Sequence, residues 1–190
     1  MNSMLPITVL SIRVSVLLLL ILSPFLAYSQ NYALNFRGNK TGHIEIPHST
    51  DLNINNAISL ECWVKPSSRS VWSNMGILFK MSKGVGGWAL TYYKPTGQFI
   101  FHLSDGKTVH RLPSSSDLPM DRYYHLAVSY NKAKGILNLW VNGKKTEKRD
   151  FKTGILATTA NLYIGRFNKE DNTSYFDGLI DEVRIWNYDK

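Results

Sequence analysis

The feature that most constrains the fold is a two-residue alternation of apolar and polar side chains, repeated in short runs from residue 31 onward. Successive side chains of a β-strand point to opposite faces, so this alternation is typical of strands that bury one face. The runs are YALNF, HIEI, ISLECWV, GILFK, WALTYY, QFIFHL, TVHRL, YYHLAVSY, GILNLWV, NLYIG and LIDEVRIW, each bounded by turn-forming residues. No segment has a convincing helical period. We therefore predict an all-β, mainly antiparallel jelly-roll sandwich of two sheets.

Three dipeptides between the runs have the chemistry of hairpin turns. Asn142-Gly143 and Asp105-Gly106 are each expected to place both residues at positive φ in a type I′ turn. Thr96-Gly97 supports a third hairpin. The basic segment 144–150 that follows Asn142-Gly143 is expected to be a solvated hairpin arm.

The alternation also predicts which side chains face the core. In two of the runs the inward set is apolar: Tyr124, Leu126, Val128, Tyr130, Leu137, Leu139 and Val141. Trp140 falls on the opposite face, with Asn138. Two interpretations of Trp140 fit that position, a ligand-binding platform for a sugar ring and a side chain half-buried under a loop. Trp63 and Trp186 are expected to lie at least partly in the core, with a ligand platform as the alternative.

The first 29 residues have the pattern of an export signal. They hold one charged side chain, Arg13, then the apolar run Val14–Leu22 and the small-residue pattern Ala27-Tyr28-Ser29. We expect a signal peptide, residues 1–29, and a secreted, extracellular or cell-surface product that begins at Gln30. The apolar run is about half of the ~20 residues needed to span a bilayer, so no membrane insertion is expected after cleavage.

Charge and cysteine content narrow the function further. The formal charge is +8 at pH 7, but the basic residues are scattered rather than arranged in a stripe with stacking aromatics, so we expect no nucleic-acid partner. A positive field remains compatible with polyanionic glycans. The single cysteine, Cys62, excludes an internal disulfide and lies between apolar neighbours, which favours a small buried side chain over a reactive thiol.

Four segments together carry a family resemblance: ALNFRGNKTGHIEIPHSTDLNINNAISLECWVKP, YYHLAVSYNKAKGILNLWVNGKK, LYIG and FDGLIDEVRIWN. In order across Ala33 to Asn187 they resemble the laminin-G-like, concanavalin A-like lectin/glucanase jelly-roll domain, in its bacterial secreted branch. The resemblance implies one such domain over residues 30–190, with the first and last strands adjacent. It also implies relatives that bind glycans or proteins, and in many cases a calcium ion at the sandwich edge.

Two departures from that family stand out. Phe36-Arg37-Gly38 occupies the place of the usual Phe-Asp-Gly and so replaces a potential oxygen ligand with a cation. The chain also ends at Lys190, where relatives commonly continue, which fits a fragment of a longer extracellular protein.

The closing strand raises the question of a metal. If Asp181 shares a face with Val183 and Ile185, it lies on the core side, where a carboxylate needs a partner. One hypothesis is a salt bridge to Arg37 or hydrogen bonds from backbone N–H groups. The other, which rests on the resemblance, is a structural calcium ion held by Asp181 and the Gly38 carbonyl, with waters completing the shell.

No catalytic residue emerges from the sequence. Some folds of this type are glycosidases with paired carboxylates, but Asp181 and Glu182 are consecutive and are expected on opposite faces of a strand. The nucleophile-elbow and zinc-protease motifs are absent from the sequence. His102 and His110 flank the Asp105-Gly106 turn; a metal pair and a plain surface pair are both open there.

The leading hypothesis is a secreted, non-catalytic module that binds an extracellular glycan or protein. The alternatives are a polysaccharide hydrolase or lyase and a structural or adhesion spacer domain.

Overall fold

The structure is a computed structural model that describes residues 32–82, 86–167 and 174–189, without the side chains of residues 146–149. The predicted signal peptide, residues 1–29, and Gln30 lie outside the described residues. The strands are β1 (Leu34–Arg37), β2 (Ile44–Ile46), β3 (Ala57–Pro66), β4 (Asn74–Ser82), β5 (Gly86–Tyr93), β6 (Gln98–Ser104), β7 (Val109–Pro113), β8 (Tyr124–Asn131), β9 (Ile136–Val141), β10 (Lys144–Asp150), β11 (Leu162–Ile164) and β12 (Asp177–Trp186), with short 3-10 turns η1 (Thr50–Leu52) and η2 (Lys94–Thr96).

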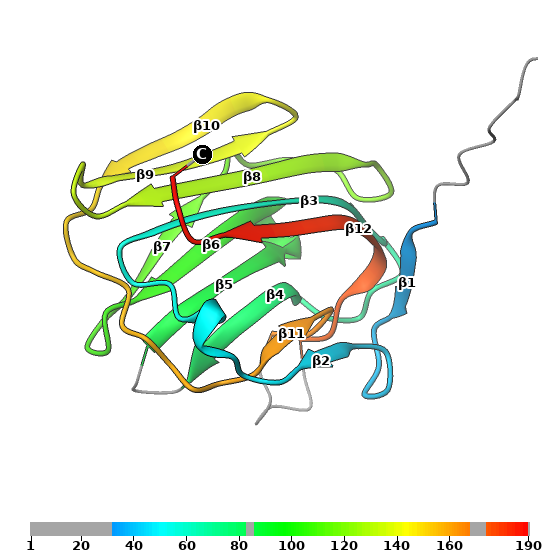
Figure 1. Ribbon diagram of the computed structural model, residues 1–190. Helices are drawn as coiled ribbons and strands as arrows, with labels where there is room; N and C mark the ends of the chain where they lie inside the picture. Colours follow the sequence, from blue (N-terminus) through cyan, green and yellow to red (C-terminus); the bar gives the residue numbers. More distant parts are fainter. Residues whose placement is uncertain (1–31, 83–85, 168–173, 190) are drawn as a thin grey trace, which may run out of the picture. The chain divides into compact units, whose positions relative to one another are not determined.

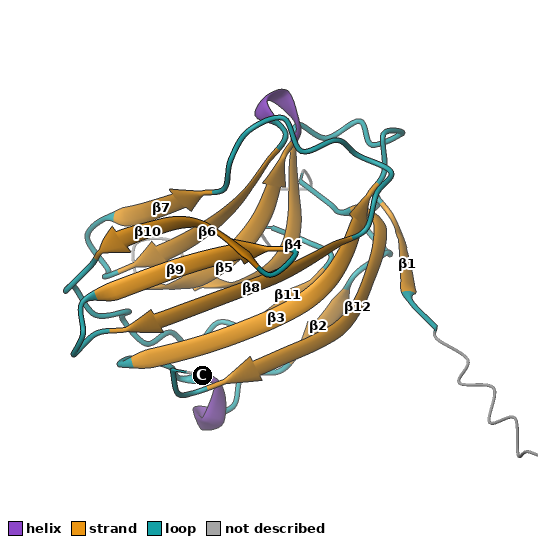
Figure 2. Ribbon diagram, turned by 90° about the horizontal axis from the view of Figure 1, so that it is seen from above, coloured by secondary structure: helices purple, strands orange, loops and turns teal. Residues whose placement is uncertain are grey.

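The strands form two six-stranded sheets, as the alternation predicts. The front sheet has the order β1-β12-β3-β8-β9-β10, and the back sheet has the order β2-β11-β4-β5-β6-β7. Figure 1 shows the closing strand β12, in red, between β1 and β3, so the first and last strands are adjacent as expected. Figure 2 shows the front-sheet strands side by side from above. The hairpin arm expected over residues 144–150 is the edge strand β10, paired with β9.

The core lies between the two sheets and is filled by alternate residues of each strand. On β3 the inward set is Ile58, Leu60, Cys62 and Val64, all fully buried, and the inward residues expected on β8 and β9 are buried as well. Burying one such aliphatic side chain stabilises the fold by about 1.5–3 kcal/mol. Cys62 is buried, as expected, and its burial raises the pKa of the thiol to about 12.

Two of the three expected turns form as predicted. Asn142 and Gly143 have φ values of 52° and 74°, the two left-handed positions of a type I′ turn, and Gly97 closes the β5–β6 hairpin at φ 59°. The expectation for Asp105-Gly106 is wrong at its first position, since only Gly106 has a positive φ, 90°. The Asp105 carboxylate instead accepts hydrogen bonds from the amides of Lys107 and Thr108 at 2.8 and 2.7 Å. This side-chain bonding organises a four-residue loop without a second left-handed residue.

A bulge interrupts β12 and changes the faces of its side chains. Asp181 pairs with Trp63 of β3, but the next pair is Arg184 with Glu61, so one extra residue is inserted on β12. Glu182 takes up the irregularity at φ 52°. The prediction that Asp181 faces the core is therefore wrong: it shares the outer face with Trp63, while Val183 packs against the core.

Candidate functional site

The outer face of the front sheet is built from the residues that alternate with the core positions. Along β3 these are Ser59, Glu61, Trp63 and Lys65. The antiparallel register sets each of them beside a residue of β12, and sets the first three also beside a residue of β8. Residues far apart in the sequence therefore meet in rows that cross the sheet.

Small side chains form the floor of a hollow on this face. Ser59 on β3 pairs with Ser129 on β8, and Ala127 on β8 lies between Glu61 on β3 and Trp140 on β9. Because the floor residues are small, the surface is depressed here, and the hollow has a volume of about 220 Å³. Such a depression exposes the strands to a ligand lying flat on the sheet.

Two tryptophans border this hollow, which we call the tryptophan hollow. Trp140 projects from β9 and Trp186 from β12, and both are half-buried. The two strands are separated by β3 and β8, so their axes lie about 14 Å apart at the usual strand spacing. The Lys145 ammonium lies 5.9 Å from the centroid of the Trp140 ring, a cation–π contact on that ring. Aromatic walls with a polar floor suit a ligand that has both apolar faces and hydroxyl groups.

A row of polar groups crosses the hollow's edge. Glu61 accepts a hydrogen bond from Arg184 Nη1 at 3.0 Å, and its other oxygen lies 3.9 Å from His125 Nε2. Arg184 also donates to Glu182. The His125 ring packs on the indole of Trp63, with 5.1 Å between the ring centroids. The row thus offers both donors and acceptors at the surface.

The three tryptophans of this face differ in how well the sequence predicted them. Trp140 faces outward with Asn138, as predicted; its role in binding stays a prediction. Trp186 is half-buried but lines the hollow from the outer face, so its expected position in the core is wrong, and its alternative role as a ligand platform stays a prediction. The expectation that Trp63 lies at least partly in the core is wrong, since its side chain projects from the outer face and is 42% exposed. The alternation of the fully apolar set at 58, 60, 62 and 64 was the signal that assigns Trp63 to the other face.

A family model described as Concanavalin A-like lectin/glucanases superfamily (Laminin G 3) matches residues 37–189. The chain belongs to this superfamily. Its two antiparallel sheets confirm the predicted fold class and the resemblance to laminin-G-like jelly rolls.

The chain is similar to several known proteins, including the following three. The serum amyloid P-component of Cavia porcellus is 26% identical over 106 residues, which is 51% of this chain and only 44% of that protein. Domains LG4-5 of the mouse laminin α1 chain share the fold with a TM-score of 0.63 at 15% identity, over 83% of this chain and 42% of that one. The CBM40 module of a Ruminococcus gnavus IT-sialidase, solved with α2,3-sialyllactose, has a TM-score of 0.58 at 14% identity, over 78% and 91%.

The residues expected to hold calcium do not come together in this concanavalin A-like chain. Along β1, Arg37 pairs with Asp177 and Leu34 with Ile180, so Gly38 and Asp181 lie beyond opposite ends of this pairing, about 13 Å or more apart at the usual rise per residue. The Gly38 carbonyl accepts the indole N–H of Trp72 at 2.8 Å. Asp181 accepts the amide N–H of Glu182 at 2.8 Å, the backbone partner that was the alternative to a metal. Asp181 and Gly38 therefore do not fit a shared ion.

No other metal cluster replaces this pair in the described part of the chain. No group of three or more His, Cys, Asp or Glu side chains that could hold an ion occurs there. The histidine pair is also not formed, because the four-residue loop sets His102 opposite Arg111 and Leu103 opposite His110. His102 is buried with its Nε2 3.0 Å from Thr91 Oγ1, whereas His110 lies 3.5 Å from Asp105.

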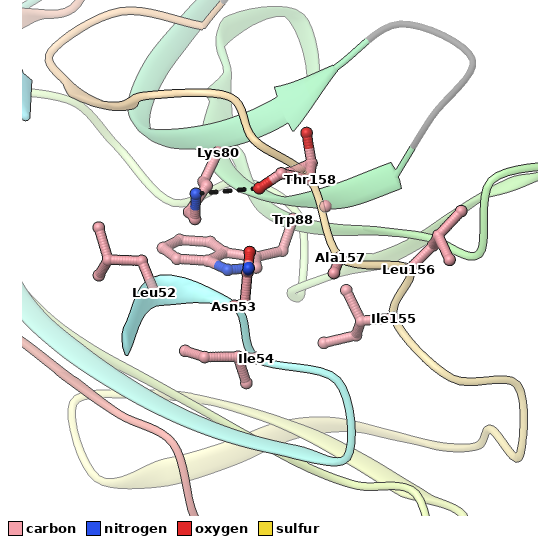
Figure 3. Close-up of a pocket in the computed structure, with 10 residues that line it drawn as sticks. Leu52, Asn53, Ile54, Lys80, Trp88, Ile155, Leu156, Ala157 and Thr158 are labelled. Atoms are coloured by element: carbon pink, nitrogen blue, oxygen red, sulfur yellow. Dashed lines mark hydrogen bonds between the residues drawn. The ribbon is translucent and has the colours of Figure 1, made fainter. Parts of the chain in front are cut away.

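A depression at the end of the sandwich proves to be closed. Figure 3 shows the Trp88 ring next to Lys80 and beside the segment 155–158. The packing leaves no space for a water molecule. Lys80 is buried, and its ammonium donates to the carbonyls of Ala160 and Thr158 at 2.7 and 3.4 Å. Lys80 therefore fastens this segment to the back sheet, and the open hollow on the front sheet is the better candidate for a ligand.

No helix in the described part of the chain is long and apolar enough to cross a membrane.

Proposed function

We propose that this protein is an exported, non-catalytic binding module and that its ligand is a carbohydrate held on the outer face of the front sheet. One observation carries the proposal: the tryptophan hollow combines two indole walls, Trp140 and Trp186, with a floor of small and hydroxyl-bearing side chains. Indole faces stack on the apolar faces of sugar rings, while the floor and the Glu61–Arg184 row hydrogen-bond hydroxyl groups. Binding of sialyllactose by a module of the same fold is consistent with this assignment.

The carboxylates of this face support binding rather than hydrolysis. A retaining glycosidase needs two carboxyl groups about 5 Å apart, one of them protonated to act as the acid. Glu61 and Glu182 instead share the guanidinium of Arg184 as a common partner, so both carboxylates are engaged in ion pairs. The bulge interrupts the strict alternation from which Asp181 and Glu182 are expected on opposite faces of the strand.

The test of the proposal is a glycan-array screen followed by titration of the strongest glycan. We expect tryptophan emission to change on binding, and Trp140→Ala to weaken binding about tenfold or more, because stacking on an aromatic ring is lost. Tyr93→Ala is the matched control, since Tyr93 is a 37% exposed aromatic at the end of β5 on the back sheet.

Each other outcome selects a different function. Binding that survives Trp140→Ala but fails in Tyr93→Ala would move the site to the back sheet. No bound glycan, together with capture of a protein ligand that Trp140→Ala abolishes, would identify a protein-binding module. Release of reducing ends or unsaturated products from polysaccharides would identify a hydrolase or lyase. If neither binding nor catalysis is found, the protein is a spacer domain.

Export is tested separately from ligand binding. The apolar run Val14–Leu22 and the pattern Ala27-Tyr28-Ser29 support cleavage after Ser29. N-terminal sequencing of the material recovered outside the cell should begin at Gln30. Recovery of the uncleaved chain in membranes would contradict it.

A further inference from the structure

A second hollow, of about 290 Å³, lies on the same outer face between β1, β12 and β3. Its walls include two cationic side chains, Lys65 of β3 and Arg69 of the loop that follows β3, and one carboxylate, Asp121. We call it the cationic hollow. Its composition differs from that of the tryptophan hollow, whose lining is aromatic, small and polar.

The two cations of this hollow are available to an anion. Arg69 Nε donates to Ser67 Oγ at 3.3 Å, which orients the guanidinium, and the Lys65 ammonium lies 5.5 Å from the centroid of the Tyr123 ring. Neither cation comes within 4.0 Å of a carboxylate oxygen among the side chains that the structure describes. A guanidinium fork and an ammonium in one hollow are the groups that proteins use for carboxylate and sulfate ligands.

The carboxylate of Asp121 is already engaged. Its Oδ1 accepts the amide N–H of Ser68 at 3.2 Å, and Asp121 itself is held at a left-handed φ of 62°. Hydrogen bonds from Ser68 lower the pKa of Asp121, with smaller contributions from the charges of Lys65 and Arg69. Asp121 thus stays charged, yet two cations against one anion leave the hollow with a net positive charge.

Strand β3 connects the two hollows in a straight line. Ser59 and Glu61 belong to the tryptophan hollow, Lys65 belongs to the cationic hollow, and the exposed indole of Trp63 projects between them. Alternate residues of a strand are about 7 Å apart, so Ser59 and Lys65 are separated by about 20 Å on one face. This strip is long enough for several sugar residues in a row, with Trp63 as a central stacking platform.

We infer that the preferred ligand is an acidic oligosaccharide that stacks on Trp140, Trp186 and Trp63 and places a carboxylate or sulfate group between Lys65 and Arg69. This inference rests on the proposed function, because it assigns a chemical class to the carbohydrate of the same face. It adds a second subsite to that face and predicts selection by charge as well as by stacking.

The experiment uses an array that carries oligosaccharides of one backbone in neutral, uronic-acid and sulfated forms. The parent is compared with Lys65→Gln/Arg69→Gln, which removes both charges and keeps side chains of similar length. The matched control is Lys107→Gln/Arg111→Gln, which removes one exposed Lys of the β6–β7 loop and one exposed Arg of β7, so that both variants lose the same net charge. Titrations run at low and high salt, since screening weakens contacts between exposed charges.

We expect the parent to prefer an acidic form over its neutral counterpart by about tenfold, or about 1.4 kcal/mol, at low salt. Lys65→Gln/Arg69→Gln should lose that preference while its affinity for the neutral form stays unchanged. The control should keep the preference, and comparison of the uronic-acid and sulfated forms identifies the anion.

The contradicting results separate this inference from the proposed function. Equal binding of neutral and acidic forms by the parent would overturn the acidic ligand and leave the carbohydrate site intact. Loss of the preference in both variants alike would show that the overall charge, not the cationic hollow, attracts the ligand. Absence of binding to every glycan would overturn the proposed function together with this inference.

Discussion

His102 shows at the scale of one residue how burial sets chemistry. It lies on β6 with its Nε2 3.0 Å from Thr91 Oγ1, and its side chain is buried. Burial, and then the positive charge of Arg111, lowers the pKa of His102 to about 4. In the unfolded chain the pKa is about 6.5. The native state therefore binds fewer protons than the unfolded state between these two values.

The sign of the resulting pH dependence follows directly. The contribution of His102 to stability is fully present above pH 6.5 and is lost as the pH falls toward about 4, by up to about 3 kcal/mol. Urea unfolding at pH 7 and pH 4.5 should show this loss in the parent and less of it in His102→Gln. An equal loss in both proteins would mean that other groups cause it.

Two tryptophans should respond very differently to truncation. Trp88 is 1% exposed and Trp63 is 42% exposed. Trp88→Ala is expected to lower the free energy of unfolding by about 3–5 kcal/mol, because it leaves a large cavity in the core. Trp63→Ala should cost about 1 kcal/mol or less, chiefly through its lost contact with His125. Similar losses on thermal unfolding would contradict the outward position of Trp63.

At the scale of single elements, the β9–β10 hairpin depends on its turn. Gly143 has φ 74°, and a Cβ added there would meet no atom within 4 Å, so the cost of a substitution is backbone strain alone. Gly143→Val should therefore destabilise the protein by about 1–2 kcal/mol, because β-branched residues disfavour the left-handed region. Gly143→Asn is the control and should cost less, and chemical denaturation measures both. A neutral Gly143→Val would show a turn of another type.

Because of the bulge in β12, we expect Asp181 to make no contribution to any stabilisation of the protein by calcium. The Asp181 carboxylate bonds the Glu182 amide and lies far from the Gly38 carbonyl, which Trp72 occupies. An ion bound only by the native state raises stability by RT ln(1 + [L]/Kd). Melting should be compared in millimolar calcium and in chelator. Any difference in melting temperature between calcium and chelator in the parent should persist in Asp181→Asn. Its disappearance in that variant would show that Asp181 is a calcium ligand.

The alternation in the sequence predicts the strands, the two-sheet architecture and most of the inward side chains, because apolar and polar residues alternate with a period of two in most strands. It fails at Asp181, since an acidic residue such as Glu182 carries no signal that it will take a left-handed conformation in a bulge. The alternation also does not predict which residues His102 and His110 pair with. That register depends on the loop, in which the Asp105 carboxylate accepts hydrogen bonds from two backbone amides. The core position predicted for Trp63 is wrong because the same period, followed through the buried residues on either side, assigns Trp63 to the outer face.

At the scale of the whole molecule, the candidate site is a product of strand order. Glu61, Ala127, Trp140 and Arg184 lie in one row across the front sheet although they come from four strands. Sequence patterns assign each of them to an outer face, but only the order β12-β3-β8-β9 sets them side by side. The sequence therefore predicts Trp140 as a candidate ligand-binding residue, whereas the hollow around it depends on the strand order.

The position of the ligand is tested most directly by the indole N–H signals in a ¹H–¹⁵N spectrum. The chain has five tryptophans, and three of them, Trp63, Trp140 and Trp186, belong to the outer face of the front sheet. On titration with the strongest glycan of the array, these three signals should shift. Those of Trp88, which is buried, and of Trp72, which donates to Gly38, should stay in place. Binding that leaves all three outer-face signals unmoved would contradict the account.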